Sequence, residues 1–155
     1  MYWLCDFESF KDGGENYVIK EISILRIDGV QCYTYRVKSP RGSNFPTNNS
    51  TITYQYNRHR IGWDEGDWKF VDAMSDICRK VKDCVVYVKG LEKKTFLEEY
   101  LPTVGELHMV PSFKKLNNCM AQWCTYRHRK HCAQRKVFEL KHYIDTYNII
   151  LAFLS

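Results

Sequence analysis

The chain has 155 residues, the usual length of one domain with a single core, so disulfides are not needed for folding. Its composition, 45% hydrophobic and 26% charged, excludes a disordered chain. Its net charge of +5 is compatible with binding to nucleic acid but does not demonstrate it. The seven cysteines are an odd number, and Cys5, Asp6 and Glu8 lie where a signal peptide would be apolar. We therefore expect an intracellular protein, cytoplasmic or nuclear, with reduced thiols. Since no stretch approaches the roughly 20 apolar residues of a membrane span, no membrane partner is expected.

Three antiparallel strands are predicted in the N-terminal part of the chain. They cover residues 2–8, 18–27 and 32–37. The first is aromatic and apolar as far as Asp6 and Glu8, and alternation along a strand places these two carboxylates on one face. The second and third are joined at Asp28-Gly29, a strong hairpin signal.

Helices and strands alternate in the rest of the chain. The spacing of apolar residues predicts a helix over 67–82, a strand over 84–88, a helix over 93–100, a brief strand over 107–110 and a helix over 132–147. Asp67 is expected to cap the first of these helices. Antiparallel strands followed by alternating helix and strand predict an α/β fold of the RNase H-like type, with a mixed sheet. We expect this domain over 1–147 and a short apolar tail over 148–155.

Cysteine and histidine residues are concentrated where the last helix begins. They are Cys119, Cys124, His128, His131 and Cys132. Thiolate and imidazole ligands suit tetrahedral Zn²⁺ in a reducing compartment, and the spacing Cys-x3-His-x3-Cys from Cys124 to Cys132 supplies three donors. The fourth would come from the other two residues or from elsewhere. The alternative is that Cys119 and Cys132 are small core residues and that both histidines belong to a solvated basic loop.

Asp6 and Glu8 form a second candidate site. Two carboxylates at a strand end can hold Mg²⁺ or Mn²⁺ for attack on a phosphodiester, but a two-metal nuclease needs further carboxylates from later elements. The charged residues that the later helices offer are Lys93, Lys94, Glu98, Glu99, Lys136, Glu139 and Asp145. An equally weighted alternative is that the pair faces solvent or a lysine.

Basic residues accompany the cysteine and histidine cluster. They are Arg127, Arg129, Lys130, Arg135 and Lys136. With Trp123 and Tyr126 nearby, they are typical of a phosphate-contacting patch with stacking aromatic rings. The alternative interpretation is a solvated basic face.

Over residues 2–143 the chain resembles the DnaQ-type exonucleases of the RNase H-like superfamily. The residues that carry this resemblance are Asp6-Phe7-Glu8, His59-Arg60-Ile61 where that family often has His-Gly-Ile, the strand-to-helix junction over 87–97, and His131-Cys132-Ala133. Active members carry an acidic residue early in the helix after the fourth strand and another five residues after the final histidine. Here those places hold Lys93 or Lys94, and Lys136, whose ammonium groups repel Mg²⁺. The resemblance thus implies that Asp6, Glu8 and His131 are vestiges of a catalytic set.

Within that superfamily, the chain more closely resembles the Maelstrom domain of germline piRNA-pathway proteins. Lys20-Glu21-Ile22-Ser23-Ile24 is similar to that family's Cys-Glu-Ile-Gly strand, and Cys124, His128 and Cys132-Ala133 are similar to its Cys, His, Cys-Ala pattern. The resemblance implies zinc ligands Glu21, Cys124, His128 and Cys132, which tie the last helix to the sheet. The family's usual first spacing is Cys-x2-His, one residue shorter than the spacing from Cys124 to His128. His131 therefore stays an alternative ligand to His128, and Cys119 stays an alternative to Glu21.

The expected function is a zinc-stabilised domain that binds single-stranded RNA or another nucleic acid and lacks two-metal exonuclease activity. Protein partners from a small-RNA pathway are a further expectation from the resemblance. Two alternatives stay open: an active nuclease that cleaves RNA or DNA with Mg²⁺ or Mn²⁺, and a degenerate nuclease fold that recruits proteins through its aromatic surface.

Overall fold

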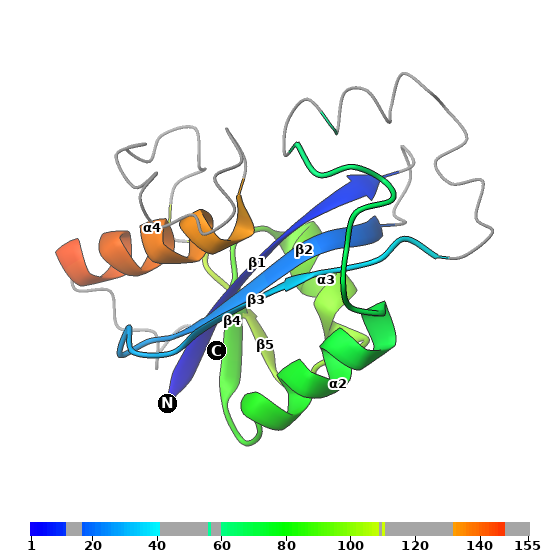
Figure 1. The fold of residues 1–155 in the computed structure, drawn as a ribbon. Coiled ribbons are helices and arrows are strands. Elements are labelled where there is room, and N and C mark those ends of the chain that lie inside the picture. Colours follow the sequence, from blue (N-terminus) through cyan, green and yellow to red (C-terminus); the bar gives the residue numbers. More distant parts are fainter. Residues whose placement is uncertain (12–16, 41–55, 57–59, 109, 111–131, 148–155) are drawn as a thin grey trace.

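The computed structural model describes residues 1–11, 17–40, 56, 60–108, 110 and 132–147. Within these residues five strands form one mixed sheet in the order β3-β2-β1-β4-β5. Helices α2 and α3 cover one face of the sheet, and helix α4 covers the other (Figure 1). None of the helices described is long and apolar enough to cross a membrane.

The N-terminal strands pair antiparallel, as predicted. Strand β1 (Tyr2–Lys11) pairs with β2 (Tyr17–Arg26), which pairs with β3 (Cys32–Arg36). In the turn between β2 and β3, Asp28 accepts a hydrogen bond from the backbone N–H of Val30, and Gly29 has a φ of +76°, which residues with a Cβ rarely adopt. The sequence Asp-Gly therefore sets the register of this hairpin.

The C-terminal half alternates between helices and parallel strands. Its elements are α2 (Phe70–Lys80), β4 (Val85–Val88), α3 (Leu91–Glu98), β5 (Val104–Glu106) and α4 (Ala133–Thr146). Strand β4 lies parallel to β1, and β5 lies parallel to β4. The predicted mixed α/β fold is confirmed.

Two local predictions are wrong. The last strand was expected over 107–110 but is Val104–Glu106, where Gly105 lies so close to Tyr87 that a Cβ would be 2.5 Å from the Cε1 atom of the ring. Asp67 does not cap α2, because the cap position is Lys69, without a side-chain hydrogen bond. The backbone N–H of Asp67 instead donates to the carbonyl of Arg36, at 3.0 Å, so this segment extends along the end of β3.

Side chains alternate between the two faces of β1. Trp3, Cys5 and Phe7 belong to the apolar core under α2 and α3, whereas Leu4 packs in the core under α4. Asp6 and Glu8 follow Leu4 on the α4 side, as the alternation of a strand requires. Both carboxylates are therefore inside the protein, with 0% and 8% of Asp6 and Glu8 exposed.

Helix α2 is joined to β3 through the buried carboxylate of Asp76. Tyr35 Oη donates to Asp76 Oδ2 at 2.6 Å, and Lys80 Nζ donates to the same oxygen at 2.5 Å. The hydrogen bonds from Lys80 and Tyr35 hold the pKa of Asp76 below its usual range. Because the folded pKa is the lower one, this stabilisation is present above the ordinary aspartate pKa and is lost as pH falls through the folded pKa.

Asp76→Asn is therefore expected to lower the free energy of unfolding at neutral pH by about 1.5 kcal/mol, the lower end for a hydrogen bond to a charged group. Urea denaturation at neutral and acidic pH measures this, and the difference from wild type is expected to shrink in acid. Asp72→Asn, on the exposed side of the same helix, is the control. An equal loss at both pH values would contradict the charged role of Asp76.

Candidate functional site

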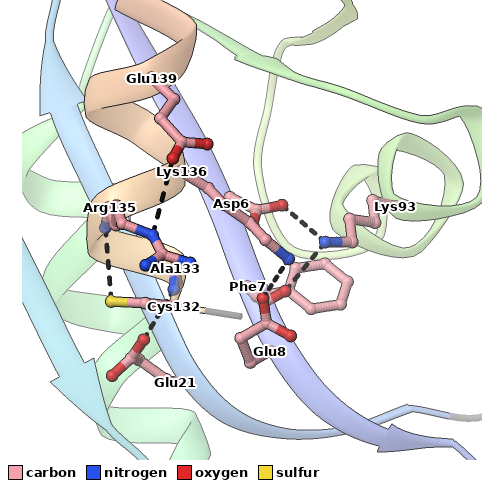
Figure 2. Close-up of polar contacts among 10 residues, drawn as sticks. All are labelled: Asp6, Phe7, Glu8, Glu21, Lys93, Cys132, Ala133, Arg135, Lys136 and Glu139. Carbon is pink, nitrogen blue, oxygen red and sulfur yellow. Dashed lines mark hydrogen bonds and ion pairs between the residues drawn. The ribbon is translucent and has the colours of Figure 1, made fainter. Parts of the chain in front are cut away.

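A cluster of charged side chains lies between the sheet and helix α4. In the antiparallel register Asp6 is opposite Ser23, and Glu8 is opposite Glu21, so strands β1 and β2 bring three carboxylates to the α4 side. The charged cluster has four acidic and four basic members: Asp6, Glu8, Glu21, Glu139, Arg36, Lys93, Arg135 and Lys136. Figure 2 shows the members of the cluster except Arg36, together with Phe7, Cys132 and Ala133.

Lys93, in the first turn of α3, reaches the middle of β1, which continues to Lys11 and so extends past the predicted strand end at Glu8. Its Nζ donates to Asp6 Oδ1 at 2.6 Å and to the carbonyl of Phe7 at 2.9 Å, and it lies 4.9 Å from the centroid of the Phe7 ring (Figure 2). Burial lowers the pKa of Lys93, but the carboxylates of Asp6 and Glu8 more than offset this, so the pKa is raised. The ammonium group therefore keeps its charge. Lys94 instead pairs with Glu98 along α3, so Lys93 is the lysine at the carboxylate site.

Lys136 approaches the same carboxylates from helix α4. Its Nζ donates to Glu8 Oε1 and lies 4.0 Å from Asp6 Oδ2 (Figure 2). Asp6 Oδ2 accepts no hydrogen bond within the part of the chain that the structure describes. Two ammonium groups thus flank Asp6, that of Lys93 from α3 and that of Lys136 from α4.

Arg135 and Lys136 were expected in an exposed, phosphate-contacting patch, but they are only 8% and 6% exposed. The Nε atom of Arg135 lies 3.6 Å from Glu139 Oε1, and burial raises the pKa of Glu139 although Arg135 and Lys136 act against it. Their interpretation as exposed side chains is therefore corrected: both face inward, toward carboxylates. The other members of that patch, Arg127, Arg129 and Lys130, lie outside the described residues.

Two of the expected zinc ligands come together at the start of α4. Glu21 Oε1 accepts the backbone N–H of Ala133 at 2.8 Å, directly after Cys132, and Arg36 Nε donates to Glu21 Oε2 at 2.8 Å. Cys132 is the N-cap residue of α4, and its Sγ accepts the backbone N–H of Arg135 at 3.4 Å (Figure 2). The expected or alternative ligands that lie outside the described residues are Cys119, Cys124, His128 and His131. In the described part of the chain no three acidic, cysteine or histidine residues are grouped as a metal site.

The sequence alone did not predict the polar contacts of Arg36 and Lys20. Arg36 is the register partner of Glu21 in the β2–β3 hairpin, so counting back from Asp28-Gly29 would have found it. Lys20 is buried and donates to the carbonyl of Trp63 at 2.7 Å, and burial lowers its pKa to about 8. No local pattern signals that contact, because it joins β2 to a segment far along the chain.

The charged cluster does not fit a pair of Mg²⁺ ions. A divalent cation beside Asp6 and Glu8 would lie next to the ammonium groups of Lys93 and Lys136. Each ammonium group at a distance of about 4 Å would oppose the doubly charged ion by about 8 kcal/mol at the effective dielectric of a protein. What the cluster does is neutralise buried carboxylates with basic groups from α3, α4 and β3. It thereby joins these elements to the centre of the sheet.

The strand order and the helices on both faces of the mixed sheet form an exonuclease-like fold. A solved structure of Exonuclease X in complex with 5′ overhanging duplex DNA is similar to this chain, with a TM-score of 0.55 and 14% sequence identity, over 99% of this chain and 97% of that one. The likeness shows that the two chains share a fold, which is the fold that the order of elements predicts. No protein-family model matches the chain, and no curated protein matches it.

Proposed function

We propose that the chain is a zinc-stabilised RNase H-like domain that binds single-stranded RNA or another nucleic acid and does not run two-metal exonuclease chemistry. The observation that carries the proposal is the pairing of Lys93 with Asp6 and of Lys136 with Glu8. These ammonium groups supply the positive charge that metal ions would otherwise provide to the carboxylates. The fold shared with a nuclease solved on DNA and the net charge of +5 support nucleic acid as the class of ligand.

The loss of catalysis is tested by incubating the protein with end-labelled single-stranded RNA and DNA and Mg²⁺ or Mn²⁺. We expect no cleavage beyond that of the Asp6→Ala/Glu8→Ala variant, because that variant removes the two carboxylates on which metal catalysis would depend. Cleavage by the wild type that the variant abolishes would overturn this part of the proposal and establish the alternative, an active nuclease.

The proposed zinc site uses Glu21, Cys124, His128 and Cys132, with Cys119 and His131 as alternates. The position of Glu21 beside the start of α4 supports it, because a ligand on β2 and a ligand at the helix N-cap would connect the helix to the sheet. A backbone N–H on the Cys132 sulfur is also compatible with a metal-bound thiolate. This arrangement supports a relationship to Maelstrom domains and, with it, partners from a small-RNA pathway.

Native mass spectrometry tests the zinc site. We expect one zinc per chain, loss of the metal on Cys124→Ser, and a lower melting temperature after chelation, because structural zinc contributes folding free energy. Cys84→Ser, a partly buried thiol that packs against the core under α2 and α3, is the control and should retain the metal. A folded protein without zinc, or a Cys124→Ser variant as stable as wild type, would contradict the proposal.

Nucleic-acid binding is tested by fluorescence anisotropy with labelled single-stranded RNA and DNA at low and physiological salt. Binding that weakens with salt is expected, because phosphate contacts release counterions. Absence of binding even at low salt would favour the other alternative, a nuclease fold that serves as a protein-interaction module.

A further inference from the structure

A concave feature separate from the charged cluster lies on the sheet face that carries α2 and α3. It is a cleft of about 1050 Å³ beside the start of β2, between the segment that leads into α2 and the end of α3. A cleft of this size is large enough for a nucleotide or a comparable small molecule. The charged cluster does not contribute to it, since none of the lining residues belongs to that cluster.

Aromatic rings form one wall of the cleft. Phe96 lies at its centre, with ring centroids 5.3 Å from Tyr17 and 5.3 Å from Tyr100, and Phe70 lies 5.1 Å from Tyr100. Phe70 and Phe96 are partly buried, whereas Tyr100 is 38% exposed, so the wall is fixed by packing and still accessible. Such a wall accepts any nucleobase, because every base has a π-face that stacks on an aromatic ring.

Two lysines lie side by side at the rim of the cleft. Val37 forms a parallel bridge with Trp68, and the N–H of Lys38 donates to the carbonyl of Trp68 at 2.8 Å, which brings Lys38 next to Lys69. Both side chains are exposed, and no carboxylate of the described residues pairs with either of them. Asp64 is the single acidic residue among the residues that line the cleft. Two neighbouring ammonium groups without carboxylate partners suit a phosphate.

We propose that this cleft binds a nucleotide unit of a single-stranded nucleic acid. The base lies against the wall formed by Phe70, Phe96 and Tyr100, and the phosphate lies between Lys38 and Lys69. The inference rests on the proposed function. It places the nucleic acid on the sheet face opposite Asp6 and Glu8. Stacking and phosphate contacts together bind single strands without reading their sequence.

The electrostatic part is tested with fluorescein-labelled oligouridylate RNA, by anisotropy at several salt concentrations. Lys69→Gln is compared with Lys82→Gln, since these exposed lysines lie beyond opposite ends of α2 and the charge change is the same. The slope of log affinity against log salt is expected to fall by about 0.7 for Lys38→Gln/Lys69→Gln, the contribution of one phosphate contact on a single strand, and by less for Lys69→Gln alone. Lys82→Gln is expected to keep the wild-type slope.

The stacking part is tested with Tyr100→Leu, which keeps an apolar side chain on Phe70 and Phe96 but removes the ring. A loss of about tenfold in affinity is expected, in the range that base stacking contributes. Tyr147→Leu, an exposed tyrosine on the other face of the sheet, is the matched control and should bind as wild type does. Circular dichroism of each variant verifies that it is folded.

The results separate this inference from the function on which it rests. If the wild type binds the RNA but Lys38→Gln/Lys69→Gln and Tyr100→Leu bind like their controls, the cleft is not the site and the proposed function stands. If the wild type binds no RNA or DNA at low salt, the proposed function fails and the inference fails with it.

Discussion

Lys136→Met is expected to lower the free energy of unfolding by about 3–5 kcal/mol, the usual effect of removing one partner of a buried ion pair. Methionine has a similar length and packs well on α4, so the loss comes from the charge and not from a cavity. Without the ammonium group, Glu8 loses its donor from α4, and Asp6 keeps only the cation of Lys93. Urea denaturation measures the difference.

Lys141→Met is the matched control, because Lys141 pairs with Asp145 along the same helix, outside the charged cluster. An exposed i,i+4 pair contributes about 0.3–0.5 kcal/mol. Combining Glu8→Gln with Lys136→Met should recover most of the stability, since the unpaired carboxylate is then gone. A Lys136→Met variant as stable as Lys141→Met would show that the charged cluster does not hold α4 to the sheet.

Patterns between neighbouring residues correctly predicted the face of β1 that carries the carboxylates and the position of the hairpin turn. Alternation along β1 placed Asp6 and Glu8 on one face, and Asp28-Gly29 located the hairpin between β2 and β3. The order of elements then indicated the RNase H-like fold without any long-range information. The position of β5 could not be predicted in this way, because it depends on Gly105 making room for the ring of Tyr87 on the neighbouring strand.

The charged cluster could be predicted only in part. The resemblance to exonucleases placed Lys93 or Lys94, and Lys136, where active members carry carboxylates. The sequence could not distinguish Lys93 from Lys94, because the distinction depends on the ion pair between Lys93 and Asp6. The burial of Arg135 was not predictable either, because basic residues next to one another usually indicate a solvated face. Its inward orientation follows from the phase of α4, which places Arg135 and Glu139 one turn apart on the same side.

The two sides of the sheet therefore have different chemistry. Under α4, acidic and basic groups neutralise one another, and a ligand would have to break ion pairs to enter. Under α2 and α3, aromatic rings and the exposed Lys38 and Lys69 surround an open cleft. Under the proposed function, the first side holds the paired carboxylates and the second side offers the surface for binding.

Lys93→Asp/Lys136→Asp is expected to create a binding site for Mn²⁺ that the wild type lacks. The substitutions remove both ammonium groups and leave four carboxylates around one point, among them Asp6, whose Oδ2 accepts no hydrogen bond from the described residues. Oxygen ligands of this kind suit Mn²⁺ and Mg²⁺. The metal-free variant should be much less stable than wild type, because four like charges are then close together.

The measurement is the melting temperature of each protein as Mn²⁺ is added, together with calorimetric titration of the metal. A metal concentration 100-fold above the dissociation constant should stabilise the variant by about 2.7 kcal/mol, and the wild type should not respond. Lys94→Asp/Lys141→Asp changes the charge equally at partly buried positions on the same two helices, outside the charged cluster, so it controls for non-specific binding of metal to a more acidic protein. If the first variant does not fold without metal, refolding in the presence of Mn²⁺ gives the same information. A variant that neither binds Mn²⁺ nor is stabilised by it would show that the lysines are not what excludes metal ions from Asp6 and Glu8.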